Sequence, residues 1–278
     1  MSGYVQIKDL PVADTVITTD QFVLQRADGT LYKVLGSTLI GQIAGIVSDV
    51  ITPVLPTNYP GLICWYQPSG LASVGVSGFY WTAWNDSSGH GRDLASHGQV
   101  SMRSLNGLPA IGAGSTDSYM QRVSTGTEFT NNSYTIITVL RGGLSDFVVK
   151  SVTSDNRIIG QSFGGTPALV NFQANDSNGL SVIVTAGQTT NAVIVVSTLN
   201  ALTGVFTTYM NGGTYSSAHP TWKATQNFQG TVKVGSFMGT SDNLVAETFA
   251  YDSVRTTHEI NNLCQQLATK FAINWISI

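Results

Sequence analysis

Between residues 61 and 252, short runs of apolar, β-branched residues alternate with clusters of Gly, Asn, Asp and Ser. Such runs are typical of β-strands, and the clusters between them are typical of tight turns. Asn211-Gly212 separates two of these runs and predicts a hairpin. Many short strands with glycine-rich turns favour a β-sandwich or jelly roll. The clearest predicted strands are 135–140, 181–185, 193–197 and 231–235.

The end of the chain has a helical period instead. Thr256 and Glu259 have the spacing of a capping box, in which the first residue caps a helix and the second lies at its third position. The spacing of the apolar residues that follow places them on one helical face. We therefore expect a C-terminal helix whose buried face is Ile260, Leu263, Cys264, Leu267 and Phe271.

Residues 1–52 have a different pattern. The runs 21–25 and 31–34 flank Asp28-Gly29, which predicts a β-hairpin. After this hairpin, apolar residues are spaced by four, three and four positions, which is a heptad seam. A seam of Leu and Ile favours three strands over two, so it predicts a homotrimer; the alternative is that this helix packs on its own domain. The seam consists of Leu39, Ile43, Ile46 and Val50.

Prolines separate this N-terminal segment from the rest of the chain. Pro53, Pro56 and Pro60 fall within eight residues, so the stretch 53–60 cannot continue a helix or form a central strand. We read it as a stiff linker. The sequence thus predicts an attachment or oligomerisation segment at 1–52, a linker at 53–60 and a β-rich domain at 61–278.

Composition excludes several classes of function. Charged residues make up 10% of the 278 positions, and the formal charge is −3. Without a cluster of Lys and Arg, no nucleic-acid partner is expected. No apolar run reaches the roughly 18–20 residues that a membrane span needs, and the N-terminus lacks the features of a signal peptide. The two cysteines are far apart, which indicates buried free thiols.

Several motifs of the β-rich domain resemble the concanavalin A-like, laminin-G-like jelly-roll superfamily. The most specific is Trp84–Leu94 (WNDSSGHGRDL), which is similar to the family's glycine-rich turn. The order of the motifs also matches the family, and the resemblance covers about four-fifths of the chain. It implies a mainly β concanavalin A-like jelly-roll sandwich with a C-terminal helix. The other matching segments are 62–66, 105–111, 209–212, 247–252 and 271–275.

Residues 1–52 resemble the virion-attachment ends of phage fibre and structural proteins. The similar features are the run that begins at Ile7, the hairpin sequence at Ala27–Thr30 and the helix start at Leu35–Leu39. This resemblance implies a phage fibre or decoration protein located in the virion. It also implies that other virion proteins are partners of residues 1–52.

The sequence lacks an obvious catalytic constellation. Glu247 and Asp252 are five residues apart, so an extended strand directs them to opposite faces instead of forming a glycosidase pair. Gly160–Gly164 fits the nucleophile-elbow pattern, but no helix pattern follows it, and a β-turn is the alternative. We therefore expect the protein not to be an enzyme, and to have no catalytic residue.

A loop rich in amides, with an aromatic residue outside any apolar period, is the strongest candidate for a glycan site. The alternative is that its tryptophan covers an edge of the sandwich. The candidate residues are Tyr215, His219, Trp222 and Asn227.

No cofactor is expected. The acidic residues Asp86 and Asp93 could hold calcium, or they could bond their own turn.

The sequence therefore predicts a non-enzymatic phage virion protein that contacts host surface glycans. The alternatives are a free-standing carbohydrate-binding adhesin module and, with less support, a polysaccharide depolymerase.

Overall fold

The protein is described by a computed structural model. The described residues are 21–25, 31–35, 54–73, 79–113, 115, 117–124, 128, 133–141, 147–151, 157–164, 169–175, 181–186, 191–218, 230–237 and 243–278. The chain divides into two compact units, Met1–Pro53 and Val54–Ile278.

The first unit contains the predicted hairpin. Strands β1 (Gln21–Gln25) and β2 (Leu31–Leu35) pair antiparallel, with Gln21 opposite Leu35 and Gln25 opposite Leu31. This pairing confirms the hairpin predicted from Asp28-Gly29. The heptad seam of Leu39, Ile43, Ile46 and Val50 lies outside the described residues.

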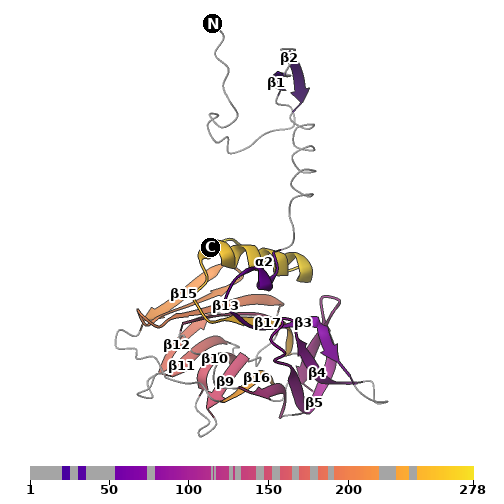
Figure 1. Cartoon of the computed structure of the whole chain (residues 1–278), viewed down its shortest axis with the longest axis vertical. Coiled ribbons are helices and arrows are strands. Elements are labelled where there is room, and N and C mark those ends of the chain that lie inside the picture. The colour runs from indigo at the N-terminus through magenta and orange to yellow at the C-terminus, as the bar shows by residue number, and fades with distance from the viewer. Residues whose placement is uncertain are drawn as a thin grey trace. The chain divides into compact units, whose positions relative to one another are not determined.

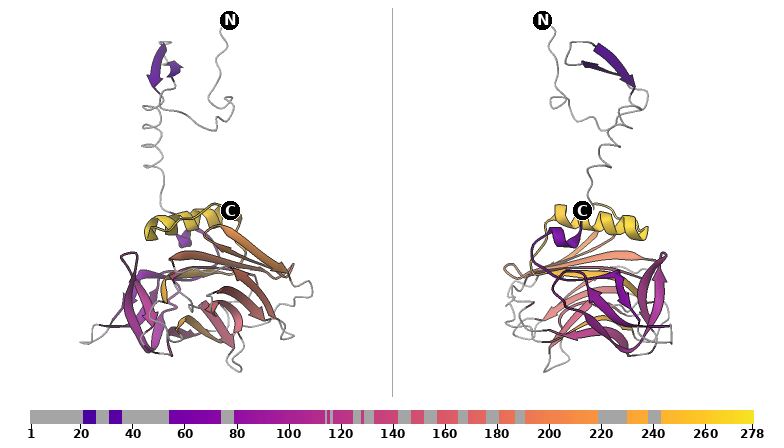
Figure 2. Two further views of the ribbon diagram at one scale, coloured as in Figure 1. Left: turned by 180° about the vertical axis from the view of Figure 1, so that it is seen from behind. Right: turned by 45° about the vertical axis from the view of Figure 1, so that its right-hand side comes forward.

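The second unit is an antiparallel sandwich. Its strands form one continuous hydrogen-bonded sheet in the order β12-β11-β10-β9-β16-β7-β5-β4-β3-β17-β8-β13-β14-β15, with β6 pairing with β5 and β17. The sheet passes through β4 and β3 at one side of the unit, which produces two facing layers (Figures 1 and 2). The strands are β3 (Leu62–Ala72), β4 (Tyr80–Asp86), β5 (Leu94–Leu105), β6 (Leu108–Ala113), β7 (Ser118–Val123), β8 (Tyr134–Arg141), β9 (Phe147–Ser151), β10 (Arg157–Gly164), β11 (Leu169–Asn175), β12 (Ser181–Ala186), β13 (Val193–Asn200), β14 (Val205–Met210), β15 (Gly213–Ala218), β16 (Gly230–Phe237) and β17 (Leu244–Tyr251).

Two apolar cores explain why some strands read as unbroken apolar runs. On β8, Ile136 faces the core between the layers, whereas Ile137 faces the core beneath the C-terminal helix. On β13, Val195 and Ile194 divide between the two cores in the same way. Both faces of these strands are therefore buried, so they lack the alternation of a half-exposed strand.

Helix α2 (Thr257–Phe271) covers the outer face of the layer that contains β13 and β17 (Figure 1). Thr256 Oγ1 accepts a hydrogen bond from the Glu259 amide, and the Glu259 carboxylate accepts one from the Thr256 amide at 2.8 Å. This geometry is the predicted capping box. The predicted apolar face is buried against the sheet. The expected jelly-roll sandwich with a C-terminal helix is thus confirmed.

The proline-rich stretch differs from the predicted linker. Residues 54–60 belong to the second unit and include the short 3₁₀ helix η2 (Pro56–Asn58). Pro56 is buried, and its carbonyl accepts a hydrogen bond from Tyr251 Oη at 2.9 Å. Prolines cannot donate backbone hydrogen bonds, but they can still pack as apolar rings against a sheet.

Two other sequence-based expectations concern local structure. Gly160–Gly164 lies within β10, where Ser162 pairs with Asn171 of β11, so the stretch is neither a nucleophile elbow nor a β-turn. Cys64 and Cys264 are buried free thiols, as expected. Within the described part of the chain, no helix is both long and apolar enough to cross a membrane.

Candidate functional site

The glycine-rich turn between β4 and β5 is organised by one carboxylate. Asp86 Oδ1 accepts hydrogen bonds from the backbone amides of Trp65 at 3.0 Å and Ser88 at 2.9 Å. Its Oδ2 accepts from Ser88 Oγ at 2.7 Å and from the Arg92 amide at 3.1 Å. Asp93 Oδ1 accepts from the Asp86 amide at 2.7 Å, so the two predicted acidic residues do lie together.

The hydrogen bonds of this turn bear on the calcium hypothesis. Both carboxylate oxygens of Asp86 accept hydrogen bonds from protein amides and a hydroxyl, as in a turn whose aspartate bonds its own backbone. Among the residues that the structure describes, no group of three His, Cys, Asp or Glu side chains is arranged to hold a metal ion. The geometry is that of a turn bonded to its own backbone.

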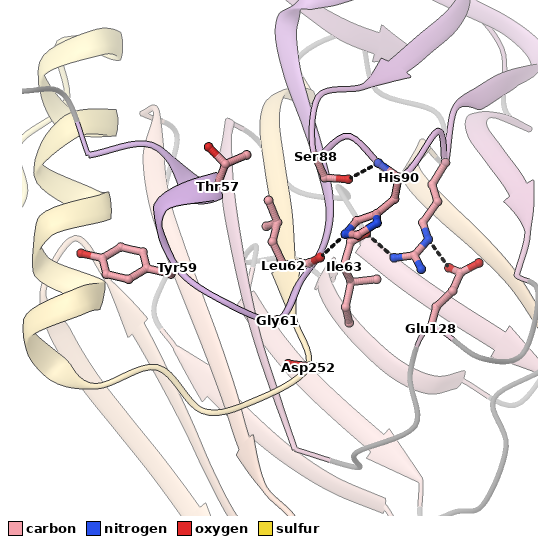
Figure 3. A pocket seen from close by; sticks show the side chains of 10 residues that line it. Thr57, Tyr59, Gly61, Leu62, Ile63, Ser88, His90, Glu128 and Asp252 are labelled. Atoms are coloured by element: carbon pink, nitrogen blue, oxygen red, sulfur yellow. Dashed lines mark hydrogen bonds and ion pairs between the residues drawn. The ribbon is translucent and has the colours of Figure 1, made fainter.

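The turn places two basic side chains against the start of β3 (Figure 3). His90 Nε2 lies 3.0 Å from the Leu62 carbonyl oxygen, so this nitrogen is the donor. The Arg92 guanidinium donates to the Ile63 carbonyl. The Arg92 carbonyl accepts from Tyr66 Oη at 2.7 Å, which fixes the turn from its inner side.

Behind these residues lies a buried ion-pair network. Arg122 of β7 donates to Glu128 through both terminal nitrogens, with Nη1 2.7 Å from Oε1. Arg92 Nε lies 3.8 Å from the same carboxylate, and Arg122 Nε donates to Tyr66 Oη at 3.1 Å. The Glu128 side chain is fully buried, so two guanidinium groups share one carboxylate that water does not reach.

The environment holds each buried group in one protonation state. Burial opposes the charge of Arg122, but its hydrogen bond to Glu128 and its contacts with Tyr66 and Cys64 leave its pKa above the ordinary value. Burial raises the pKa of Tyr66, so its phenol stays neutral and serves as a fixed hydrogen-bond donor and acceptor. Burial also raises the pKa of Cys64 to about 12, so its thiol is not a nucleophile at neutral pH.

A cavity of about 380 Å³ opens beside this network (Figure 3). We call it the His90–Arg92 pocket; its polar lining residues are Thr57, Ser88, His90, Arg92, Glu128 and Asp252. A second cavity of about 360 Å³ shares His90, Arg92 and Glu128 and also touches Asp93 and Arg122. His90 is exposed and Arg92 half-buried, so these two side chains stand between two open spaces that a ligand can reach.

The structure does not test the predicted glycan residues. His219, Trp222 and Asn227 lie outside the described residues, and Tyr215 lies on β15, where its side chain is not described. Sequence reasoning missed Arg92, Arg122 and Glu128. The only available signal was their rarity, since charged residues make up 10% of this chain.

Glu247, considered with Asp252 as a glycosidase pair and rejected from the sequence, lies elsewhere. It is buried between β17 and α2, where its Oε1 accepts from Trp65 Nε1 at 2.7 Å and its Oε2 from Lys270 Nζ at 2.6 Å. Burial raises the pKa of Glu247, and Lys270 offsets part of that rise. This side chain ties the helix to the sheet and does not line the His90–Arg92 pocket.

Comparison of the sequence with protein-family models and with curated proteins finds no match. Solved structures do share the fold. A Trypanosoma rangeli sialidase in complex with sialic acid aligns with a TM-score of 0.54 and 13% identity over 91% of this chain and 45% of the sialidase. The binding domain of botulinum neurotoxin DC in complex with SialylT aligns with a TM-score of 0.53 and 14% identity over 75% of this chain and 52% of that one. The receptor-binding domain of a botulinum neurotoxin C/D mosaic serotype gives a TM-score of 0.56 at 10% identity over 75% of this chain.

The chain spans about half the length of these structures, and at such identities the likeness shows the fold alone. The fold is that of a β-sandwich shared by receptor-binding domains and sialidases. The expectation that the protein is not an enzyme, drawn from the lack of a catalytic constellation in the sequence, is wrong, because sialidases are among the solved structures that share this fold. The virion role inferred from residues 1–52 stays a prediction.

Proposed function

We propose that residues 54–278 form a carbohydrate-binding module and that its ligand occupies the His90–Arg92 pocket. The observation that supports this most directly is the pocket itself. Its lining residues include an arginine, a histidine, two carboxylates and the hydroxyl residues Thr57 and Ser88, around a cavity of about 380 Å³. Sugar hydroxyls both donate and accept hydrogen bonds, so a mixed set of fixed polar groups suits them.

The pocket is organised before a ligand arrives. Asp86 fixes the turn that bears His90, while Glu128 and the Ile63 carbonyl fix the Arg92 guanidinium. Side chains held in this way lose little conformational freedom on binding, which favours affinity. The aligned sialidase and neurotoxin binding domain, whose titles name sialic acid and SialylT, make a sialylated glycan the first ligand to test.

Titration of the full chain with 3′-sialyllactose and with lactose by isothermal calorimetry tests the proposal. We expect His90→Ala to weaken binding about tenfold, because it removes a polar group from the pocket wall. His97→Ala is the matched control, since His97 is a half-buried histidine on β5 that lines neither cavity around His90. Equal affinities of the two variants would contradict the assignment of the pocket.

Glycoside hydrolysis is a second candidate, and one specific observation favours it. Glu128 and Asp252 both line the His90–Arg92 pocket, and glycosidases use two carboxylates around one bond; Asp252 is the one that a substrate can reach, because the Glu128 side chain is fully buried and paired with Arg122. Release of reducing ends from a sialylated or capsular polysaccharide, lost in Asp252→Asn, would support hydrolysis. Binding without any product at saturating protein would leave the module as a binding domain.

We also propose that residues 1–52 attach the module to a phage virion as a homotrimer. The division of the chain at Pro53/Val54 supports a separate attachment unit. Light scattering after size exclusion compares the full chain with a chain that starts at Val54. A full-length trimer that becomes a monomer on truncation would support this role, whereas two monomers would contradict it.

A further inference from the structure

A cavity separate from the two around His90, of about 360 Å³, lies at the C-terminal end of α2. Four segments that are distant in sequence meet there: the β5–β6 turn, the approach to β13, the β14–β15 turn and the residues that follow α2. We call it the asparagine cavity, because four of its lining residues are Asn106, Asn191, Asn211 and Asn274. None of the described residues that line it is charged.

The walls of the asparagine cavity are fixed by the backbone. Asn106, Asn211 and Ala272 each have φ of 49°, and they are the non-glycine residues with positive φ in the described part of the chain. All three line this cavity. Two of them begin Asn-Gly turns and the third is the left-handed cap that ends α2, so each has a defined backbone conformation.

Those contacts join both turns to the end of the chain. Asn106 Nδ2 donates to the Phe271 carbonyl at 2.6 Å, and the Asn211 carbonyl accepts from the Ile276 amide at 3.2 Å. Asn211 Oδ1 also accepts from the Ile194 amide at 2.9 Å. The two turns and the C-terminal segment therefore form one rigid frame around the cavity.

The same hydrogen bonds leave a complementary set of amide groups for a ligand. Asn211 accepts at Oδ1, and no described residue bonds its Nδ2; Asn106 donates from Nδ2, and no described residue bonds its Oδ1. The exposed Asn274 side chain makes no hydrogen bond to the described residues and supplies a further donor and acceptor. Adjacent sugar hydroxyls, each a donor and an acceptor, match such a set.

Electrostatics decides between charged and uncharged ligands. The carbonyl end of a helix carries partial negative charge, so the C-terminus of α2 at this cavity disfavours an anion. Among the described lining residues, a cation finds no carboxylate to pair with. We propose that the asparagine cavity binds one ring of an uncharged saccharide. This site does not depend on the His90–Arg92 pocket, which is charged and has a different lining.

Chemical-shift mapping of the labelled full chain tests this inference with four uncharged probes. They are methyl α-mannoside, methyl β-glucoside, methyl β-galactoside and N-acetylglucosamine, each raised to about 10 mM, because single-ring ligands bind weakly. We expect at least one probe to give saturable shifts at Asn106, Asn211 and Asn274. The anionic methyl glycoside of N-acetylneuraminic acid is expected to give none at these residues.

Asn274→Ala is the decisive variant, since it removes an exposed side chain that no described contact needs for folding. We expect it to weaken saccharide binding at least about fivefold. Asn85→Ala, at an exposed asparagine of β4 outside the cavity, is the matched control and is expected to leave affinity unchanged.

Three results would overturn the inference. One is the absence of saturable shifts with all four probes, and another is unchanged affinity in Asn274→Ala. The third is loss of the same shifts in His90→Ala, because that would make the His90–Arg92 pocket the only saccharide site. Equal affinities of His90→Ala and His97→Ala for sialyllactose would contradict the proposed function and leave the asparagine cavity unaffected.

Discussion

Two Asn-Gly turns offer a matched pair of substitutions. Asn106-Gly107 closes the β5–β6 hairpin, and Asn211-Gly212 closes the β14–β15 hairpin, with glycine φ angles of 87° and 95°. A Cβ added at Gly107 meets no atom within 4 Å. A Cβ added at Gly212 lies 2.0 Å from the carbonyl oxygen of Ile276. Gly107→Ala and Gly212→Ala therefore differ in surroundings while sharing the same local conformation.

The expected cost follows from that difference. Both variants place a side chain in the left-handed region, which lowers stability by about 1–2 kcal/mol. Alanine also reduces the conformational entropy of the unfolded chain, which offsets part of this loss equally in both variants. Gly212→Ala adds an overlap that costs about 1–3 kcal/mol, because the obstacle at Ile276 is backbone and cannot rotate away. We expect Gly212→Ala to be less stable than Gly107→Ala by about 2 kcal/mol.

Thermal unfolding of both full-length variants, followed by circular dichroism, measures this difference. For a domain of this size, 2 kcal/mol corresponds to a gap in Tm of about 4–8 °C. Equal Tm values would refute the reasoning, since they would mean that the chain end at Ile276 does not press on the β14–β15 turn. The asparagine cavity would then lack the rigid wall that its geometry implies.

Three further predictions concern buried charge, pH and the helix cap. Glu128→Gln leaves Arg122 buried without its full counter-charge and is expected to cost about 3 kcal/mol in urea unfolding, whereas the exposed Asp117→Asn is expected to change stability by under about 0.5 kcal/mol. Glu247 has a pKa raised by burial above the ordinary 4.5, so the folded state binds its proton more tightly than the unfolded chain. The stability that this proton contributes is present below about pH 4.5 and is lost as pH rises through the pKa of Glu247 in the folded state. Glu247→Gln should therefore flatten the decline of the unfolding free energy above about pH 4.5. The same slope in the variant and the original protein would contradict this prediction. Thr256→Ala removes the cap of α2 and is expected to cost about 1 kcal/mol, whereas Thr256→Ser is expected to restore most of it.

The elements that could be predicted from sequence are those whose cause is local. Thr256 and Glu259 reach each other within one helical turn, so their spacing alone predicts the start of α2. Asn211-Gly212 predicts its hairpin because few other dipeptides adopt two positive φ angles in succession. The linker predicted at 53–60 differs from the structure for the opposite reason, because the conformation of 54–60 depends on distant residues. The prolines in the sequence indicate only which backbone conformations are excluded. They do not indicate that Tyr251 Oη donates to the Pro56 carbonyl.

The Glu128 network shows why the His90–Arg92 pocket was harder to predict. A glutamate among polar residues is typical of an exposed turn, and only the fold brings it beside two arginines in a buried position. The turn that contains Arg92 was recognisable from its Asp and Gly pattern. The contact of Arg92 with the Ile63 carbonyl of β3 was not recognisable, because a contact between residues more than twenty positions apart leaves no local signal in the sequence.

The asparagine cavity shows a second way in which a site escapes sequence reasoning. The two Asn-Gly turns explain why asparagine stands at 106 and 211, so the local sequence pattern gives no sign of a further role. A turn, however, uses only part of an asparagine carboxamide. Each of these side chains uses one end of its carboxamide in a hydrogen bond within the fold. The other ends lie at a common cavity, which the C-terminal segment helps to line. The turns account for the backbone conformation of Asn106 and Asn211, but not for their meeting at one cavity with residues of other segments. What their carboxamide groups bind there therefore needs a separate test.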